Sequence, residues 1–242
     1  MSKFVALLQR DVRGIYRDGF LVMMTVYTLL IAVAARIVLR WVSIEHIEVY
    51  VAPFIIIAAC SLVGLVFGFA LVEERETQTW LLMRVIPISQ RTLATYWLVA
   101  VGGFCFVITL LSALIYGLAP ASAMGVLVFA AVTAVGAPVV MLLLGALASN
   151  KIEGMAVGKV ISASSLLLVP VFVLPSEWHV AVMWYPWYWL YLGLLRAYAG
   201  PELAPALAVQ WPPVPLWAQA VIPLVLSLFA LVLLTRRYRR TQ

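Results

Sequence analysis

The 242-residue chain has a composition that soluble domains do not reach, with 65% hydrophobic and 11% charged residues and a formal net charge of +6. Soluble domains carry about 25% charged residues, so the composition excludes a soluble protein and predicts an all-α integral membrane protein. The two cysteines, Cys60 and Cys105, lie in apolar runs without a CxxC spacing. We therefore expect both to be small apolar packing residues.

The N-terminal segment 1–19 combines an apolar and a basic helical face. The residues of the two faces are Phe4, Leu8, Val12 and Ile15, and Arg10, Arg13 and Arg17. This spacing is typical of a basic amphipathic helix that lies flat on the inner leaflet, with its arginines at anionic headgroups. The alternative is a solvated start to the first span. Because charges precede any long apolar run, no cleavable signal is predicted.

Two runs without Asp, Glu, Lys or Arg, 49–72 and 92–150, define the membrane-spanning part of the chain. A crossing needs about 20 apolar residues, so the first run holds one span and the second holds two, which meet at a turn near residue 118. When the same length criterion is applied to the rest of the chain, it predicts six transmembrane helices: 20–39, 50–72, 93–118, 121–148, 160–174 and 216–235.

The basic residues indicate the orientation of these spans. Most Lys and Arg residues fall on the side that carries both termini, and the positive-inside rule places that side in the cytoplasm. Arg36, Arg40 and Arg196 lie at or beyond the outer face. The long side chain of Arg36 can extend outward from the end of its span, which favours a structural role over an intramembrane functional one.

An aromatic and proline-rich region occupies residues 176–215. Its first part contains Trp184, Tyr185, Trp187, Tyr188, Trp189 and Tyr191, with Pro186 among them. Rings of this kind suit the outer headgroup belt, and a proline in the middle of a would-be helix interrupts it. We expect an outer re-entrant or interfacial helix pair between the fifth and sixth spans, followed by a stiff external linker.

A charged segment between two apolar runs, residues 73–91, separates the second span from the third, and we call it the charged island. Another protein could contact the membrane domain here and move it. Glu73, Glu74 and Glu76 surround Arg75 at the end of the span. An acid/base or cation site is one interpretation of this cluster. A structural ion-pair network is favoured, because a guanidinium lies among the carboxylates at the membrane boundary.

No catalytic or metal-binding residue is predicted. His46 and His179 are far apart in the sequence and belong to no HExxH motif. The segment 154–160 superficially suggests a phosphate loop, but the gap before its Gly-Lys pair is too short and Val160 replaces the required Ser or Thr. No cofactor is expected in this chain, and any ATP chemistry must come from another one.

The sequence resembles the ABC-2 type ABC transporter permeases, and among them the bacterial permeases of the fluoroquinolone-exporter type. Four segments carry this resemblance. They are the opening at 7–20 with Arg17-Asp18-Gly19-Phe20, the island 73–89 ending in Pro87-Ile88-Ser89, the run Asn150-Lys151-Ile152-Glu153-Gly154, and the aromatic stretch with Pro186-Trp187-Tyr188-Trp189.

The resemblance implies one transmembrane domain over residues 1–242, with an elbow helix at 1–19 and a coupling helix within the loop 73–91. The coupling helix would dock into a separate ATPase subunit. Its docking residues would be Thr79, Trp80, Leu81, Met83 and Arg84. The family often has glycine where this chain has Gln78. The ion-paired base of the loop would be Glu73, Glu74, Arg75 and Glu76, facing Arg10, Arg13 and Arg17 of the elbow.

The resemblance further implies an assembly of two permeases, identical or homologous, with two ATPases that bind ATP and magnesium, in the bacterial inner membrane. Membrane lipid is a partner and nucleic acid is not. Spans two and five would line the path of an amphiphilic drug or lipid. The candidate path residues are Phe54, Cys60, Phe67, Ser162, Ser165, Leu168 and Phe172. The alternatives are a haem-exporter-type permease, which His46 and His179 keep open, a membrane-embedded transferase, and the substrate-capturing subunit of a vitamin importer.

Overall fold

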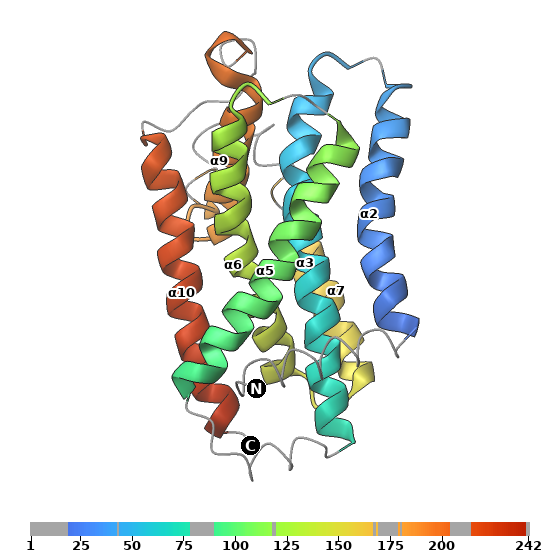
Figure 1. The fold of residues 1–242 in the computed structure, drawn as a ribbon, viewed down its shortest axis with the longest axis vertical. Helices are drawn as coiled ribbons and strands as arrows, with labels where there is room; N and C mark the ends of the chain where they lie inside the picture. Colours follow the sequence, from blue (N-terminus) through green and yellow to red (C-terminus); the bar gives the residue numbers. More distant parts are fainter. Residues whose placement is uncertain are drawn as a thin grey trace, which may run out of the picture.

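The computed structural model describes residues 19–42, 44–77, 90–117, 120–166, 168, 179, 181–203 and 214–240. This part of the chain is a helical bundle (Figure 1). Its helices are α2 (Gly19–Leu39), α3 (Ile47–Glu76), α5 (Gln90–Tyr116), α6 (Ala123–Leu147), α7 (Lys151–Leu166), α9 (Pro186–Leu203) and α10 (Leu216–Arg240).

Among the described residues, four helices are long and apolar enough to cross a membrane: α3, residues 95–116 of α5, α6, and residues 216–237 of α10. These four correspond to the second, third, fourth and sixth predicted spans. A shorter apolar stretch, Val26–Leu39, belongs to α2, where the first span is predicted. The fifth predicted span begins at residue 160, whereas α7 begins earlier, at Lys151, and much of 160–174 lies outside the described residues. The all-helical architecture is confirmed, and the full set of six spans stays a prediction.

Helix α3 is the centre of the bundle and packs against α2, α5, α6, α7 and α9. Its approach to α6 depends on Gly64 and Gly68. A Cβ atom added at Gly64 would lie 2.6 Å from the Cβ of Val140, and one at Gly68 would lie 2.8 Å from Cδ2 of Leu144. Small residues four apart allow two apolar helices to come close enough for extensive van der Waals contact, which is the main attraction between helices in lipid.

Several polar side chains inside the helices donate hydrogen bonds to backbone carbonyls. The hydroxyls of Thr133 and Thr235 donate to the carbonyls of Phe129 and Leu231, four residues earlier, at 2.7 and 2.6 Å. The thiol of Cys60 donates to the carbonyl of Thr133 at 3.0 Å. Both cysteines are buried and free, so they occupy the packing positions expected from the sequence. Such pairing is required where no water is available to hydrogen-bond a polar group.

The aromatic region differs from its sequence prediction. Pro186 does not interrupt a helix but begins α9, a position where proline removes no helical hydrogen bond. The rings of Trp187, Tyr188, Trp189 and Tyr191 are buried in the bundle rather than placed in a surface belt. Only Trp184 before the helix is strongly exposed, at 74%, among the tryptophans and tyrosines from 184 to 191.

The burial of these rings is possible because their polar edges find partners inside the protein. The hydroxyl of Tyr191 donates to the carbonyl of Tyr50 at 2.5 Å, and the indole of Trp189 donates to the carbonyl of Met183 at 2.7 Å. A buried Tyr or Trp normally needs such a partner. The sequence prediction assigned these edges to water, whereas the structure pairs them with backbone carbonyls.

Part of the predicted external linker is also helical. Helix α9 continues past a break at Gly200, where φ is 65° and ψ is −178°, and ends at Leu203. Before this break, α9 is joined to the start of α6, since the Ser122 amide donates to the Ala197 carbonyl at 2.9 Å. Residues 204–213 lie outside the described part of the chain.

Candidate functional site

The candidate site lies where α3 ends, at the lower end of the bundle in Figure 1. The sequence places Glu73 to Glu76 at the base of a loop, but in the structure they form the last turn of α3. The turn is closed by Thr77, whose hydroxyl and amide both donate to the Glu73 carbonyl, at 2.8 and 2.9 Å. The segment predicted to contact a partner therefore follows a 30-residue helix in the chain.

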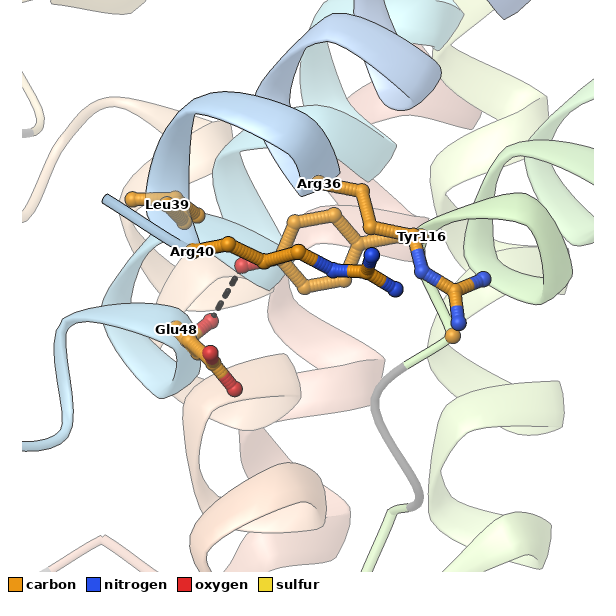
Figure 2. A pocket seen from close by; sticks show the side chains of 6 residues that line it. Arg36, Leu39, Arg40, Glu48 and Tyr116 are labelled. Carbon is orange, nitrogen blue, oxygen red and sulfur yellow. Dashed lines mark hydrogen bonds between the residues drawn. The ribbon is translucent and has the colours of Figure 1, made fainter. Parts of the chain in front are cut away.

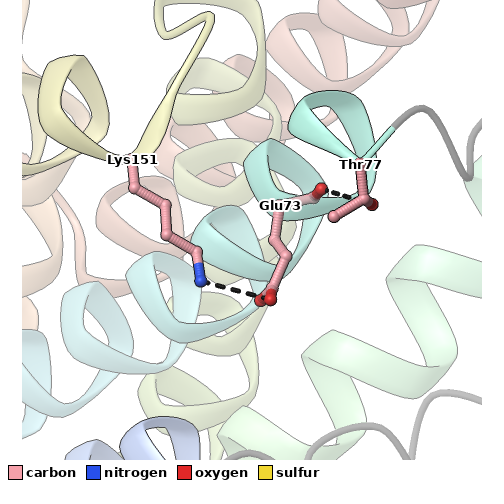
Figure 3. A network of polar contacts seen from close by, with 3 residues as sticks. All are labelled: Glu73, Thr77 and Lys151. Atoms are coloured by element: carbon pink, nitrogen blue, oxygen red, sulfur yellow. Dashed lines mark hydrogen bonds and ion pairs between the residues drawn. The ribbon is translucent and has the colours of Figure 1, made fainter.

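An ion pair joins this last turn to α7. Nζ of Lys151 lies 3.1 Å from Oε1 of Glu73 (Figure 3). The two side chains are 50% and 40% exposed, so water screens their attraction and the pair contributes about 1 kcal/mol or less to stability. The pair is important mainly for its position, because it connects the end of α3 to the start of α7.

Arg75 makes a second connection to the same corner. Its Nη1 atom lies 3.5 Å from the carbonyl oxygen of Ala148, which caps the C-terminus of α6. The last carbonyls of a helix carry partial negative charge and lack helical partners, so a guanidinium is favourable there. Together, Glu73 and Arg75 connect the end of α3 to the segment that links α6 and α7.

The corner itself is fixed by a reciprocal cap. The side chain of Asn150 accepts a hydrogen bond from the Glu153 amide at 2.9 Å, and Oε2 of Glu153 accepts one from the Ser149 amide at 2.8 Å. This arrangement is close to a capping box, which satisfies free amides at the start of a helix. Helix α7 thus begins within the run Asn150-Lys151-Ile152-Glu153-Gly154, and this start places Lys151 within ion-pair distance of Glu73.

Helix α7 is held against α3 by close packing as well. A Cβ atom added at Gly154 or Gly158 would lie 3.1 or 3.7 Å from the ring of Phe69. The segment 154–160, which superficially suggests a phosphate loop, lies within α7. Its glycines let the two helices approach each other next to the Glu73–Lys151 pair.

Several predicted site residues lie outside the described residues. They are Thr79, Trp80, Leu81, Met83 and Arg84 of the coupling segment and Arg10, Arg13 and Arg17 of the elbow. The predicted partners of the acidic cluster were the elbow arginines and Arg75. Lys151, the partner of Glu73 in the structure, was missed, although the span prediction had placed both residues on the same side of the membrane.

The predicted path residues do not share one surface. Cys60, Ser165 and Leu168 are buried inside the chain, whereas Phe54, Phe67 and Ser162 are half-buried, and Phe172 lies outside the described residues. Phe67 packs edge to face on Phe104, with ring centroids 5.7 Å apart. Ser165 donates its hydroxyl to the Ser162 carbonyl at 2.6 Å.

The two histidines contact separate elements. Nδ1 of buried His179 lies 3.2 Å from the Tyr188 hydroxyl, and Nε2 of His46 lies 3.5 Å from Oε1 of Glu45. His46 also occupies the N-cap of α3 in the left-handed conformation, with φ 58°. Within the described part of the chain, no group of three or more His, Cys, Asp or Glu side chains is arranged to hold a metal ion.

The site therefore consists of three helix ends, those of α3, α6 and α7, joined by an ion pair, a guanidinium–carbonyl contact and a cap. Such an arrangement can transmit a displacement from a loop to two helices. A comparison with curated proteins finds no match. A family model described as fluoroquinolones export permease protein Rv2686c-like matches residues 11–235, which is nearly the whole chain. The chain belongs to this Rv2686c-like family of fluoroquinolone export permease proteins.

Proposed function

We propose that the chain is the membrane-spanning permease subunit of an ATP-driven ABC exporter. A separate ATPase subunit binds ATP and magnesium, and two permease subunits, identical or homologous, form the path. The family membership over residues 11–235 is the observation that carries this proposal. Six spans with both termini in the cytoplasm of a bacterial cell complete the proposed arrangement.

The connection at the end of α3 supports a role in energy transfer. In our proposal the ATPase contacts the segment that begins after Thr77, with Trp80 as its main apolar anchor. A push on this segment reaches α3 first. Because Glu73 and Arg75 connect α3 to the α6–α7 corner, the same push also moves α7.

The substrate class follows from the side chains of the proposed path. Phe54, Phe67 and Ser162 on α3 and α7 are half-buried, so a shift of these helices can expose them. They offer apolar surface and one hydroxyl but no charge. An amphiphilic drug or a lipid-like molecule suits such a lining better than an ion does, because no fixed counter-charge is present to select an ion.

The test uses transport in inverted membrane vesicles. The chain is co-expressed with a candidate ABC ATPase subunit from the same cell, and ATP-dependent uptake of a fluorescent amphiphile is measured. We expect uptake with both subunits and none when the catalytic glutamate of the ATPase is replaced. Absence of ATP-dependent uptake with both intact subunits would argue against the proposed function.

The docking assignment is tested separately with Trp80→Ala. Loss of an aromatic anchor at an interface centre costs about 2 kcal/mol or more, so we expect co-purification of the ATPase to fall at least about tenfold. The matched control is Trp217→Ala, which removes another tryptophan, 69% exposed, at the start of α10 and at the other end of the bundle from the last turn of α3. Equal co-purification of the two variants would show that Trp80 is not a docking residue.

A further inference from the structure

A hollow of about 180 Å³ lies at the upper end of the bundle, at the opposite end of α3 from the Glu73–Lys151 pair (Figure 2). The end of α2, the start of α3 and the end of α5 meet there. The hollow is lined by Arg36, Leu39, Arg40, Glu48, Tyr116 and Gly117. Two guanidinium groups and one carboxylate thus face a small space at one end of an otherwise apolar bundle.

Arg36 is fixed in place by α5. Its Nη1 atom donates to the Ile115 carbonyl at 3.0 Å, in the last turn of α5, where a cation is favourable. Gly117 follows with φ +75°, and a Cβ atom added to it would lie 2.5 Å from Nη1 of Arg36. The guanidinium therefore occupies the space that a side chain at position 117 would fill. A guanidinium has five N–H donors, so others remain for a ligand.

Arg40 lies four residues later, directly after the end of α2 at Leu39. In Figure 2 the two guanidinium groups extend toward the same side of the hollow, and the Glu48 carboxylate lies apart from them. Among the described residues, the side chains of Arg40 and Glu48 make no hydrogen bond or ion pair. Arg36 and Arg40 line the same hollow, and a bound anion lowers the repulsion between two such like charges.

The surface around the hollow is apolar. Trp41, next to Arg40, is 85% exposed, and Ile37 and Val38 of α2 are also exposed. On α5, Leu111 and Leu114 are exposed within two turns of Tyr116. An exposed tryptophan beside arginines at the end of an apolar helix is typical of the membrane–water interface. The anion that suits this place therefore carries an apolar tail.

We propose that the hollow binds the headgroup of a zwitterionic phospholipid, with its phosphate at Arg36 and Arg40 and its ammonium group at Glu48. Guanidinium groups match phosphate oxygens bidentately, and the nearby carboxylate disfavours a headgroup that is purely anionic. The acyl chains lie along the exposed apolar residues of α2 and α5. This site is independent of the transport proposal, because it lies at the opposite end of α3 from the Glu73–Lys151 pair.

Native mass spectrometry of the delipidated full-length chain tests the assignment. Phosphatidylethanolamine is titrated in detergent against wild type, Arg40→Gln and the control Lys159→Gln, which removes an exposed charge of α7 outside the hollow. We expect the Kd for phosphatidylethanolamine to rise about tenfold in Arg40→Gln, the effect of losing one charge-assisted contact, and to stay unchanged in the control. Equal affinity in all three proteins would overturn the site.

Two further arms identify the ligand. Glu48→Gln should shift the preference from phosphatidylethanolamine toward phosphatidylglycerol, and an unchanged preference would overturn the ammonium contact. Inorganic phosphate at millimolar concentration should not displace the lipid. If it does, the site takes a soluble anion and the lipid assignment is wrong.

Gly117→Ala, which displaces the Arg36 guanidinium without changing charge, should weaken lipid binding in the same direction as Arg40→Gln.

Discussion

At the scale of single residues, the contact between Glu73 and Lys151 joins two helices but adds little to the stability of the fold. Both side chains are about half exposed, so solvent screens most of their attraction. The pair nevertheless joins two helices, because Glu73 lies in the last turn of α3 and Lys151 begins α7. Its importance should appear in the coupling of ATP hydrolysis to transport, and hardly in the free energy of unfolding.

A charge exchange tests this role. Glu73→Lys places two ammonium groups at a distance where the wild type has an ion pair of 3.1 Å, so we expect reduced transport per ATP hydrolysed. The double variant Glu73→Lys/Lys151→Glu restores the attraction with reversed polarity, and coupling should recover. The measurement is the ratio of substrate uptake to phosphate release in reconstituted vesicles.

The control for this exchange is Lys159→Glu, which reverses an exposed charge on the same helix two turns away. It should leave the coupling ratio unchanged. If the double variant is as defective as the single one, the two residues do not act through their ion pair. The predicted contact of Glu74 with the elbow arginines would then be the better candidate for the link.

At the scale of helices, the position of α3 against α6 depends on the absence of side chains. Gly64 lies so close to α6 that an added Cβ atom would be 2.7 Å from the Ala137 carbonyl oxygen, a backbone atom that cannot rotate away. Any substitution there must separate the two helices. In contrast, a Cβ atom added at Gly103 of α5 would meet nothing within 4 Å.

The same substitution at these two glycines should therefore have opposite effects. Gly64→Ala should lower the free energy of unfolding by about 1–3 kcal/mol through overpacking. Gly103→Ala should leave it unchanged or raise it by up to about 1 kcal/mol, because alanine is the better helix former. Unfolding in detergent, followed by circular dichroism, measures both. A Gly64→Ala variant as stable as Gly103→Ala would show that α3 and α6 are farther apart than the structure places them.

At the scale of the whole molecule, the first and last described helices have their outer ends at the same end of the bundle. Helix α2 begins and α10 ends at the lower end of the bundle, where α3 also ends (Figure 1). The hollow with Arg36 and Arg40 is at the other end. The two ends of the bundle therefore differ: the candidate coupling site lies at one end and the proposed lipid site at the other.

Reporter fusions test the orientation of this axis. A reporter that is active only outside the cytoplasm should be silent when fused after Gln242 and active when fused after Ala204, because the proposed topology puts the C-terminus in the cytoplasm. A cytoplasmic reporter provides the reciprocal control. An active external reporter at the C-terminus would contradict the six-span topology and reverse the sides of both sites.

Local sequence patterns predicted the helices well where burial in lipid alone determines them. Helices α3, α5, α6 and α10 follow from apolar length, since each must satisfy its backbone internally in a membrane. The same reasoning missed the burial of the α9 rings, because the Tyr191 hydroxyl is satisfied by the carbonyl of Tyr50, which is distant in the chain. Composition cannot show such partners.

By itself, the sequence determined the class of the protein, the apolar helices and the charged island at the end of α3, because hydrophobic length and charge are local properties of a chain. Only the tertiary structure decided that Glu73 pairs with Lys151, that α9 enters the bundle, and that Arg36, Arg40 and Glu48 share one hollow. Each of these depends on helices meeting in space. The close approach that brings them together is set by glycine contacts and long-range hydrogen bonds, which no local pattern encodes.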